Sequence, residues 1–482
     1  MADINGTAYQ RSALSQTWWF LRRWPVLPLV ILSVLVIVGA GACGLCAALA
    51  AKESGANVLV LEQDSTPLGT TAMSTGLIPG AGTRLQSAAG IEDSAELFTA
   101  DIMKKTRNQT DAKIALQLAK ESAKTIEWLI DNHNIPLSLV DSFLYPGHSV
   151  MRMHGSPNRT GSELMGTLCS AAEKAGVDIL TNALVTDLLS DDENRVLGVR
   201  IQRPDGEVEE IGCKSLILGC CGFAGNNEMV EQFIPEIVEA EFFGHPGNKG
   251  DAIKWGQMLG ADVADISSYQ GHGGLAVGHG VPILWPMIME GAFQVNQLGK
   301  RFSDESLGYS EQAVEVIKQP DHIAWNIYDQ KLHELMMEFE DYNNALDAKA
   351  ISTAANIDEL AEITGINKQS LASTIAKVEK LAKGIKKDTF GRNFEGKSPL
   401  KPPYYTVKVT GALFHTQGGL VVDNNARVLT EEGNPLPNLF AGGGAARGIS
   451  GPSNWGYMAG NGLLTATTLG RLAGSSAAEM VS

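Results

Sequence analysis

A glycine-rich turn between an apolar run and a small-residue helix constrains the fold of this chain more than any other feature. The run Val34–Val38 is continuously apolar, as in a strand buried on both faces. The turn Gly39-Ala-Gly-Ala-Cys-Gly44 has the G-x-G-x-x-G spacing, and it is followed by an expected helix over 47–54 and an apolar run over 58–61. This order predicts the β-α-β unit of a dinucleotide-binding fold.

The residues of the turn have defined tasks in such a unit. Gly39 makes the tight turn, Gly41 lets the backbone approach a pyrophosphate, and Gly44 packs the helix against the strand. The N-terminus of the helix faces the phosphates. Glu62, which ends the second strand 23 positions after Gly39, can accept hydrogen bonds from ribose hydroxyls.

The same stretch contains Cys43-Gly-Leu-Cys46, a C-x-x-C that could instead mark a redox dithiol. A working dithiol needs exposed, electropositive surroundings, whereas both sulfurs are expected to be buried against the sheet or the cofactor. We interpret both residues as small hydrophobic side chains, and Cys220 and Cys221 in the same way.

Composition limits the function classes. The chain has 482 residues, enough for two or three domains, and a net charge of −16, which disfavours binding to nucleic acid. Six cysteines in a chain of this length do not make a disulfide scaffold, and a reduced compartment is expected. We predict no metal site.

The N-terminus allows two interpretations. Arg22-Arg23 precede an almost wholly apolar run over 24–42, which resembles a twin-arginine signal or a short membrane segment. Cleavage near Ala42 would destroy the glycine turn, because the second half of the run is the strand before it. We expect a cytoplasmic chain in which residues 1–33 are an extension. Membrane association through residues 18–33 is the alternative.

Periodicity predicts regular elements along the rest of the chain. We expect helices over 110–132 and 161–175 and strands over 177–180 and 185–189, with VLGVRIQ and EVEEIGCKSLILGC continuing the same sheet. A further strand and glycine turn precede a closing helix over 462–473.

The segment between about 245 and 400 has a different sequence pattern from the residues on either side. Asn356 and Glu359 form an expected capping box for a helix that Gly365 ends, and a helical stripe over 371–381 stops at Gly384. We therefore expect an α/β fold in which residues 34–244 and 401–482 form a Rossmann-like domain. Residues 245–400 would form an inserted α+β cap over it.

Several motifs occur together in the order found in one protein family. They are PLGTTAMSTG, GCCGFAGNNEM, HPGNKGDAIKWGQMLGADVADI, VNQLGKRFSDE, FHTQGGLVVD, PNLFAGGG and GNGLLTATTLGRLAG. From about Val34 to Ala473 the chain resembles the flavoprotein subunit of fumarate reductases and succinate dehydrogenases, and the related 3-ketosteroid dehydrogenases and tricarballylate dehydrogenase. The resemblance implies a glutathione-reductase-like fold that binds FAD.

The resemblance places extended FAD between the first turn and the closing turn Gly442–Gly444, with the flavin ring facing the cap. The N-terminus of the closing helix would lie near the flavin carbonyl and stabilise the anionic reduced ring. Some members attach FAD through a histidine after the first glycines; residues 69–82 contain none, so non-covalent FAD is expected. The implied cofactor-binding residues are Gly39, Gly41, Ala42, Gly44, Glu62, Gln63, Thr70, Thr71, Ser74, Gly76, Val185, Gly222, Asp251, Gly443, Gly444, Gly462, Leu463 and Leu464.

Two histidines match family positions that bind substrate, and two arginines are missing. His272 follows Gln270-Gly where the reductases have Q-x-H-P, and His415 matches the histidine of H-T-x-G-G. Tyr309 stands at about the place of the proton-donating arginine that follows R-F-x-N-E. The second arginine, which binds the other carboxylate, is replaced in the stretch that holds Asn454, Trp455 and Tyr457.

These replacements change the substrate that the pocket suits. A dicarboxylate needs the charge-assisted, bidentate hydrogen bonds of arginine, which neutral side chains cannot replace. A tyrosine can hydrogen-bond a ketone oxygen, or act as acid or base where a neighbour lowers its pKa, and tyrosine-lined flavin pockets are what ketosteroid dehydrogenases use. The predicted catalytic residues are His415, Tyr457, Tyr309 and His272. The two tyrosines could instead only pack, and Arg152, Arg159 and Arg447 remain possible anion partners.

The combined prediction is an FAD-dependent oxidoreductase that adds or removes two hydrogens across a C–C bond next to a carbonyl. One alternative is a fumarate reductase- or tricarballylate dehydrogenase-type enzyme that acts on a carboxylate. Another is a flavin-binding electron-transfer subunit without turnover. The expected partners are a small-molecule carbonyl compound and, since no haem C-x-x-C-H motif occurs, a separate electron donor or acceptor.

Overall fold

A sheet built around the first apolar run carries the glycine turn. The computed structural model describes residues 34–481, so the predictions for residues 1–33 lie outside the described residues. The six strands of this sheet are, in spatial order, β19 (Arg427–Leu429), β20 (Pro435–Ala441), β10 (Ser215–Leu218), β1 (Val34–Val38), β2 (Asn57–Leu61) and β6 (Asp178–Leu180). All neighbours run parallel except β19 and β20. The strand next to the closing glycine turn therefore completes the sheet that the first strand begins.

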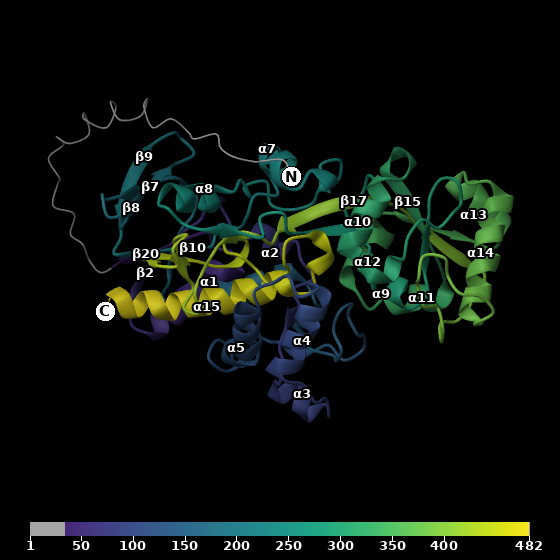
Figure 1. Cartoon of the computed structure of the whole chain (residues 1–482), viewed down its shortest axis with the longest axis horizontal. Helices are drawn as coiled ribbons and strands as arrows, with labels where there is room; N and C mark the ends of the chain where they lie inside the picture. Colours follow the sequence, from purple (N-terminus) through teal and green to yellow (C-terminus); the bar gives the residue numbers. More distant parts are fainter. Residues whose placement is uncertain (1–33, 482) are drawn as a thin grey trace, which may run out of the picture. The chain divides into compact units, whose positions relative to one another are not determined.

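Two helices pack closely against this sheet and against each other. Helix α1 (Ala42–Glu53) and the C-terminal helix α15 (Asn461–Val481) lie side by side (Figure 1). A Cβ atom at Gly470 or Gly474 would lie 2.4 Å or 2.1 Å from a carbonyl oxygen of α1. Helix α1 begins five residues before the predicted start because the end of the glycine turn is already helical, and α15 continues beyond 473 to Val481.

The predicted helices over 110–132 and 161–175 are α5 (Ala112–Asp131) and α6 (Gly161–Lys174). Asp111 and Thr160 cap them with side-chain oxygens that accept backbone N–H groups. The expected continuation of the sheet was wrong in part. β7 (Leu184–Ser190), β8 (Val196–Gln202) and β9 (Val208–Gly212) form a separate antiparallel sheet, because the loops between them are too short for parallel crossovers.

A second six-stranded sheet is centred on β17 (Tyr404–Thr416). β17 pairs with β11 (Glu241–Phe242), β13 (Tyr269–Ala276), β15 (Ile323–Asp329) and β16 (Ile351–Ala354), and β15 also pairs with β14 (Phe293–Val295). This sheet takes in residues 404–416, which lie beyond the predicted cap boundary at 400. The division into domains stays a prediction.

Helices α13 (Ile357–Thr364) and α14 (Lys368–Ala382) lie where the capping signals predicted them (Figure 1). Asn356 accepts the backbone N–H groups of Asp358 and Glu359, and left-handed Gly365 ends α13. The remaining elements are α2 (Gly69–Ala72), β3 (Ile78–Pro79), α3 (Arg84–Ala88), α4 (Ala95–Lys105), β4 (Ser138–Leu139), β5 (Met153–Gly155), α7 (Asn227–Phe233), α8 (Asp251–Met258), β12 (Val263–Ala264), α9 (Pro286–Met289), α10 (Tyr309–Ile317), α11 (Gln330–Met336), α12 (Glu340–Asp347), β18 (Gly419–Leu420) and short 3₁₀ turns.

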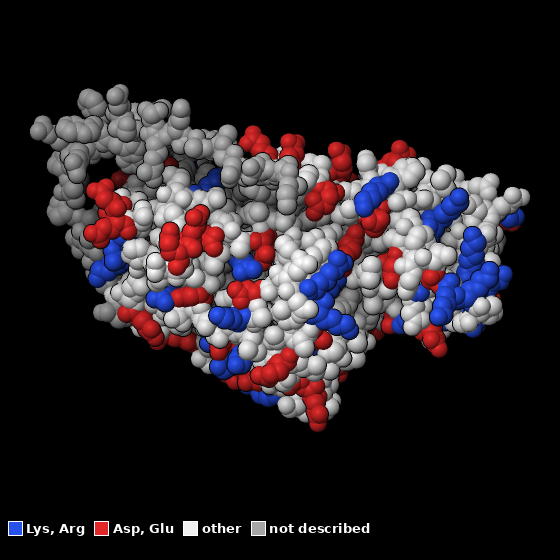
Figure 2. Space-filling view, in the orientation of Figure 1, with Lys and Arg blue, Asp and Glu red and all other residues white. Residues whose placement is uncertain are grey.

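The surface carries charges of both signs. On the face shown in Figure 2, acidic and basic side chains are intermixed. Of the helices described within residues 34–481, none is long and apolar enough to cross a membrane.

Candidate active site

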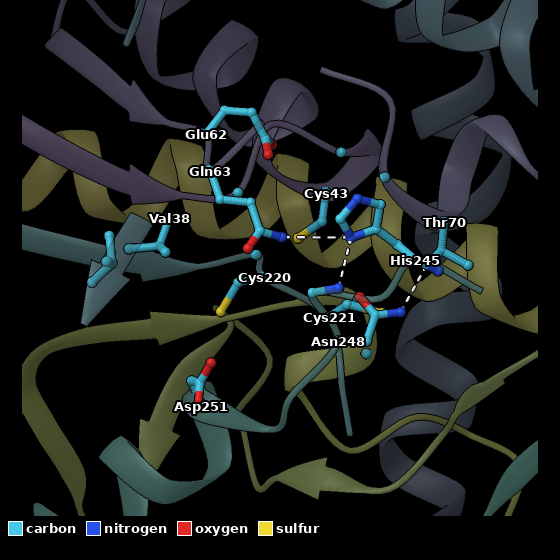
Figure 3. Close-up of a pocket in the computed structure, with 18 of the residues that line it drawn as sticks. Val38, Cys43, Glu62, Gln63, Thr70, Cys220, Cys221, His245, Asn248 and Asp251 are labelled. Atoms are coloured by element: carbon cyan, nitrogen blue, oxygen red, sulfur yellow. Dashed lines mark hydrogen bonds between the residues drawn. The ribbon is translucent and has the colours of Figure 1, made fainter. Parts of the chain in front are cut away.

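The first cavity opens at the N-terminus of α1, where β1, β2 and β10 end (Figure 3). It encloses ≈ 850 Å³, and its wall comes from the glycine turn, the end of β2, α2, the loops after β10 and β11, and the turn before α15. Eleven predicted cofactor residues line it: Gly39, Gly41, Ala42, Glu62, Gln63, Thr70, Thr71, Val185, Asp251, Gly443 and Gly444.

Close backbone contacts explain the glycines of the turn. Gly39 has a φ of +97°, and a Cβ there would lie 2.7 Å from the carbonyl oxygen of Gly219. A Cβ at Gly44 would lie 1.8 Å from the carbonyl oxygen of Gly39. The turn therefore presents bare backbone and the helix N-terminus to the cavity, which is the environment that a pyrophosphate needs.

Glu62 has two roles at the end of β2. Its side chain is buried, and its two carboxylate oxygens accept the backbone N–H groups of Ala40 at 2.9 Å and Asp64 at 3.0 Å. It thereby ties β2 to the glycine turn. Since each carboxylate oxygen has further acceptor capacity, Glu62 can still accept ribose hydroxyls from the cavity.

The cavity wall also holds a polar cluster that was not predicted. His245 Nε2 lies 2.7 Å from a carboxylate oxygen of Asp64. The Nδ1 of His245 accepts the backbone N–H of Gly247 (Figure 3). Asn248 donates to the Thr70 hydroxyl at 2.8 Å. The HPGNKGD motif was a usable signal, but only its Asp251 was predicted.

All six cysteines are free thiols. Burial raises the pKa of Cys43 well above its ordinary value and that of Cys46 to about 12. Both side chains are buried, and Cys43 lines the cofactor cavity. A buried thiol with a raised pKa is a poor nucleophile, which supports the interpretation of these residues as small hydrophobic side chains.

A second, larger cavity of ≈ 1230 Å³ continues from the first. Thr70, Thr71, Cys221, Gly444 and Ala466 line both. Of the other predicted cofactor residues, Ser74, Gly462 and Leu463 line the second cavity, whereas Gly44, Gly76, Gly222 and Leu464 line neither. Gly222 instead lets the Thr416 side chain pack against the backbone, because a Cβ at Gly222 would lie 1.9 Å from the Thr416 hydroxyl.

The structure brings all four predicted catalytic side chains together in the wall of this second cavity. The ring centroids of His415 and Tyr457 are 5.8 Å apart, those of Tyr457 and Tyr309 are 6.0 Å apart, and those of Tyr309 and His272 are 5.1 Å apart. Four residues separated by up to 185 positions in the chain thus form one continuous row.

His415 is neutral. Gln417 accepts the Ser450 hydroxyl through its Oε1, and its Nε2 lies 3.0 Å from His415 Nδ1, which also lies 3.3 Å from the carbonyl oxygen of Thr416. Burial lowers the pKa of His415 to about 4. The ring lies against the first turn of α15, since a Cβ at Gly462 would lie 2.8 Å from its Cε1.

His272 is also neutral. Its ring stacks between Tyr309 and Phe414, its Nδ1 accepts the backbone N–H of Gly274 at 3.1 Å, and burial lowers its pKa to about 3. Its Nε2 therefore carries the proton.

The two tyrosines are protonated donors. Burial raises the pKa of both well above the usual value, and a hydrogen bond between the hydroxyls raises that of Tyr309 further while it lowers that of Tyr457. Acid–base catalysis by a tyrosine would require a neighbour that lowers its pKa. At both residues, burial, which raises the pKa, has the larger effect.

A buried ion network holds the loop before Tyr309. Arg301 binds Glu305 at 2.7 Å and Asp388 at 2.8 Å, and Arg392 binds Glu305 at 3.0 Å. The arginine and glutamate of the RFSDE motif thus position Tyr309 at the start of α10 rather than contact substrate.

Of the three candidate anion partners, two are already engaged. Arg152 is fully buried and binds Asp93 and Asp101, and Arg447 binds Asp265 at 2.7 Å. Neither lines a described cavity. Arg159 differs, because its buried Nη1 has no hydrogen-bond partner among the described residues.

Several lining residues were not predicted. The second cavity is rich in aromatic and apolar side chains, and among its described lining residues there is no Lys or Arg and one acid, Asp341. The unpredicted members include Tyr145, Phe243, Leu284, Trp285, Asp341 and Phe414. Isolated aromatic residues carry no sequence pattern that separates a pocket wall from a core.

Comparisons with known proteins agree with this geometry. Residues 35–463 match the family described as FAD binding domain. A probable fumarate reductase of Shewanella frigidimarina is 30% identical over 447 residues, which cover 92% of this chain and 74% of that protein. This chain is a flavoprotein of the fumarate reductase and succinate dehydrogenase family. As a member of that family, the enzyme is an FAD-dependent oxidoreductase that acts on carbon–carbon bonds.

Two solved structures share its fold over almost the whole chain. The open conformation of a flavocytochrome c3 fumarate reductase has a TM-score of 0.78 and 30% identity, covering 93% of this flavoprotein and 79% of that chain. A 3-ketosteroid Δ4-(5α)-dehydrogenase from Rhodococcus jostii has a TM-score of 0.73 and 26% identity, covering 92% and 97%. The cavity fits FAD, because the Gly39–Gly44 cradle, the N-terminus of α1 and Glu62 are arranged for its diphosphate and ribose.

Proposed function

We propose that this flavoprotein oxidises or reduces a C–C bond next to the carbonyl group of a small molecule that is neutral at that end. The observation that carries the proposal is the charge of the second cavity: its described wall has four neutral hydrogen-bonding candidates and no Lys or Arg. A buried dicarboxylate in such a wall would be uncompensated, at a cost of several kcal/mol for each charge.

The row of side chains suits a carbonyl oxygen. Tyr457 and the neutral His415 lie on the α15 side of the cavity, and the Tyr457 hydroxyl is hydrogen-bonded to that of Tyr309. Donors aimed at a carbonyl stabilise the negative charge that builds on its oxygen in the transition state. Bound FAD would supply hydride chemistry, and the hydroxyls of Tyr309 and Tyr457, whose pKa values are raised by burial, would stay protonated and polarise the carbonyl.

Reduction or oxidation of a carboxylate is the second candidate. It is supported by the 30% identity to a probable fumarate reductase and by the unpartnered Nη1 of Arg159. In either case we propose that a separate donor or acceptor exchanges electrons with FAD. A flavin-binding subunit without turnover is the third candidate, and the assembled row of donors argues against it.

Turnover of matched substrates tests the proposal. Purified enzyme is assayed with dye-linked oxidation and reduction of cyclic ketones and enones, fumarate and succinate. Tyr457→Phe should reduce ketone turnover about 10²–10³-fold, as removal of an oxyanion-hole donor does. His415→Ala should reduce it about 100-fold or more.

The matched control is Tyr405→Phe, whose hydroxyl donates to Gln330 and lies outside both cavities. It should retain turnover. Good turnover of fumarate or succinate, with Tyr309→Phe and Tyr457→Phe both fully active, would contradict the proposal and favour the carboxylate candidate.

A further inference from the structure

One charged side chain stands in the wall of the substrate cavity without a partner. Asp341 lies in the first turn of α12 and lines the second cavity. Within residues 34–481, its carboxylate makes no hydrogen bond and no ion pair. The adjacent Glu340 belongs to the same turn but is exposed and does not line the cavity.

Asp341 is half-buried in the cavity wall. Partial burial, with a smaller contribution from Glu340, raises the pKa of Asp341 from its usual range to about 6. A carboxylate that is partly removed from water and has no hydrogen-bond donor is disfavoured in its charged form. Favourable interaction with the N-terminus of α12 does not explain the position of Asp341 in the cavity wall, because the exposed Glu340 provides the same interaction outside the cavity.

Asp341 lines the same cavity as the predicted catalytic row and acts electrostatically on its neighbour Tyr145. The pKa of Tyr145 is raised by Asp341 and lowered by Arg159, and Tyr145 in turn raises the pKa of Tyr309. Tyr309 contacts Tyr457, which contacts His415. Asp341 and Tyr145 line the same cavity as His415, Tyr457 and Tyr309, and Asp341 acts electrostatically on Tyr145, which in turn acts on Tyr309.

We propose that Asp341 binds a hydrogen-bond-donating group, a hydroxyl or an ammonium, at the end of the substrate opposite its carbonyl. The substrate class is thus an elongated hydroxy- or amino-ketone that spans the tyrosines. This inference rests on the proposed function for the position of the carbonyl. It does not depend on the direction of the reaction.

Arg159 offers the competing explanation. Its guanidinium lies 5.9 Å from the ring centroid of Phe339, just before α12, and its unpartnered Nη1 could pair with Asp341 after a movement. The two groups form no ion pair in this structure. If that pairing were the role of Asp341, Arg159→Gln and Asp341→Asn would have the same effect on every ligand.

Ligand titrations of the FAD-loaded enzyme test the proposal. The probes are 4-phenylcyclohex-2-enone and its 4-hydroxyphenyl and 4-(aminomethyl)phenyl analogues, and the dissociation constant is read from the flavin absorption spectrum at pH 8. Wild type should bind the two donor-bearing probes at least 10-fold more tightly than the phenyl probe. Asp341→Asn should abolish that preference for the ammonium probe and leave phenyl affinity within about 2-fold, whereas Glu340→Gln should change neither.

A pH series on the wild type gives a measurement that needs no variant. Affinity for the ammonium probe should fall as the pH drops through about 6, where the Asp341 carboxylate gains a proton, with Glu340, Arg159 and Tyr145 as the other charged or titratable groups facing it. Equal wild-type affinity for all three probes, including no binding, overturns the inference. So does an equal loss of all three in Asp341→Asn and Arg159→Gln.

Failure of the proposed function has a different signature. In that case Tyr457→Phe would leave phenyl-probe affinity and turnover unchanged, while the preference for donor-bearing probes would still depend on Asp341.

Discussion

Substitution of Gly44 by Ala tests how tightly the first helix is seated on the cofactor turn. Gly44 lies in α1, so the new methyl group brings the usual helix gain of about 0.5–1 kcal/mol over glycine. The same group would lie 1.8 Å from the carbonyl oxygen of Gly39. An ordinary contact of about 3.4 Å requires a displacement of about 1.6 Å, and the obstacle is backbone that no side-chain rotation can move.

The expected cost combines strain with lost cofactor contacts. Overpacking of this kind costs about 1–3 kcal/mol, which exceeds the helix gain. A shift of the turn also separates the N-terminus of α1 from the pyrophosphate. The loss of one charge-assisted hydrogen bond there, about 1.5–3 kcal/mol, corresponds to a 10- to 100-fold weaker affinity for FAD.

Gly166→Ala is the matched control. Gly166 lies in α6, is exposed, and has nothing within 4 Å of the position that the new methyl group would take, so this variant should gain about 0.5–1 kcal/mol and keep its flavin. The assay measures bound flavin per chain, the FAD dissociation constant after reconstitution, and denaturant unfolding. Equal flavin affinity and equal stability in the two variants would refute the close seating of α1.

Three further predictions follow from the sites described. Acid or denaturant should release the flavin from the polypeptide, since residues 69–82 contain no histidine for attachment; flavin that stays with precipitated protein would contradict this. Cys43→Ala and Cys46→Ala should keep FAD and turnover, and native protein should resist alkylation at both sites at pH 8, because burial raises both pKa values; turnover lost with FAD retained would revive the dithiol interpretation. Asp341→Asn should raise the free energy of unfolding at pH 8. The gain should vanish near pH 3.5, because a carboxyl whose folded pKa is raised to about 6 destabilises the fold only where it is ionised; unchanged stability at pH 8 would show that the carboxylate is well solvated.

The sequence predicted the features that depend on local pattern. The unit from Val34 to Glu62 was predictable because strand, glycine turn and helix each have a residue signature and follow one another directly. The row of His272, Tyr309, His415 and Tyr457 was predictable because each residue lies in or near a motif that the family resemblance aligned.

Features that depend on distant partners were not predictable. The central place of β17 in the second sheet follows from pairing with residues up to 171 positions away, and no periodicity encodes it. The engagement of Arg152 by Asp93 and Asp101 is equally invisible in sequence, so Arg152 could not be separated from the unpartnered Arg159. Burial, which makes both predicted catalytic histidines neutral, likewise requires the three-dimensional structure.

The pairing of β10 with β20 sets the order in which the cofactor site can be completed during synthesis. Leu216–Leu218 of β10 pair with Leu439–Ala441 of β20, which are synthesised much later. The turn at Gly443 and Gly444 comes directly after β20 in the chain. At the usual rate of about 5–20 residues per second, the ribosome needs about 10–40 s to deliver that partner strand. During this interval the nascent β10 has an unpaired edge, and the part of the FAD cavity wall formed by Gly443, Gly444 and Ala466 does not yet exist. FAD capture is therefore a late event, coupled to arrival of the final strand and helix, and a chain that stops before Pro435 retains the first glycine turn without a closed site for the cofactor.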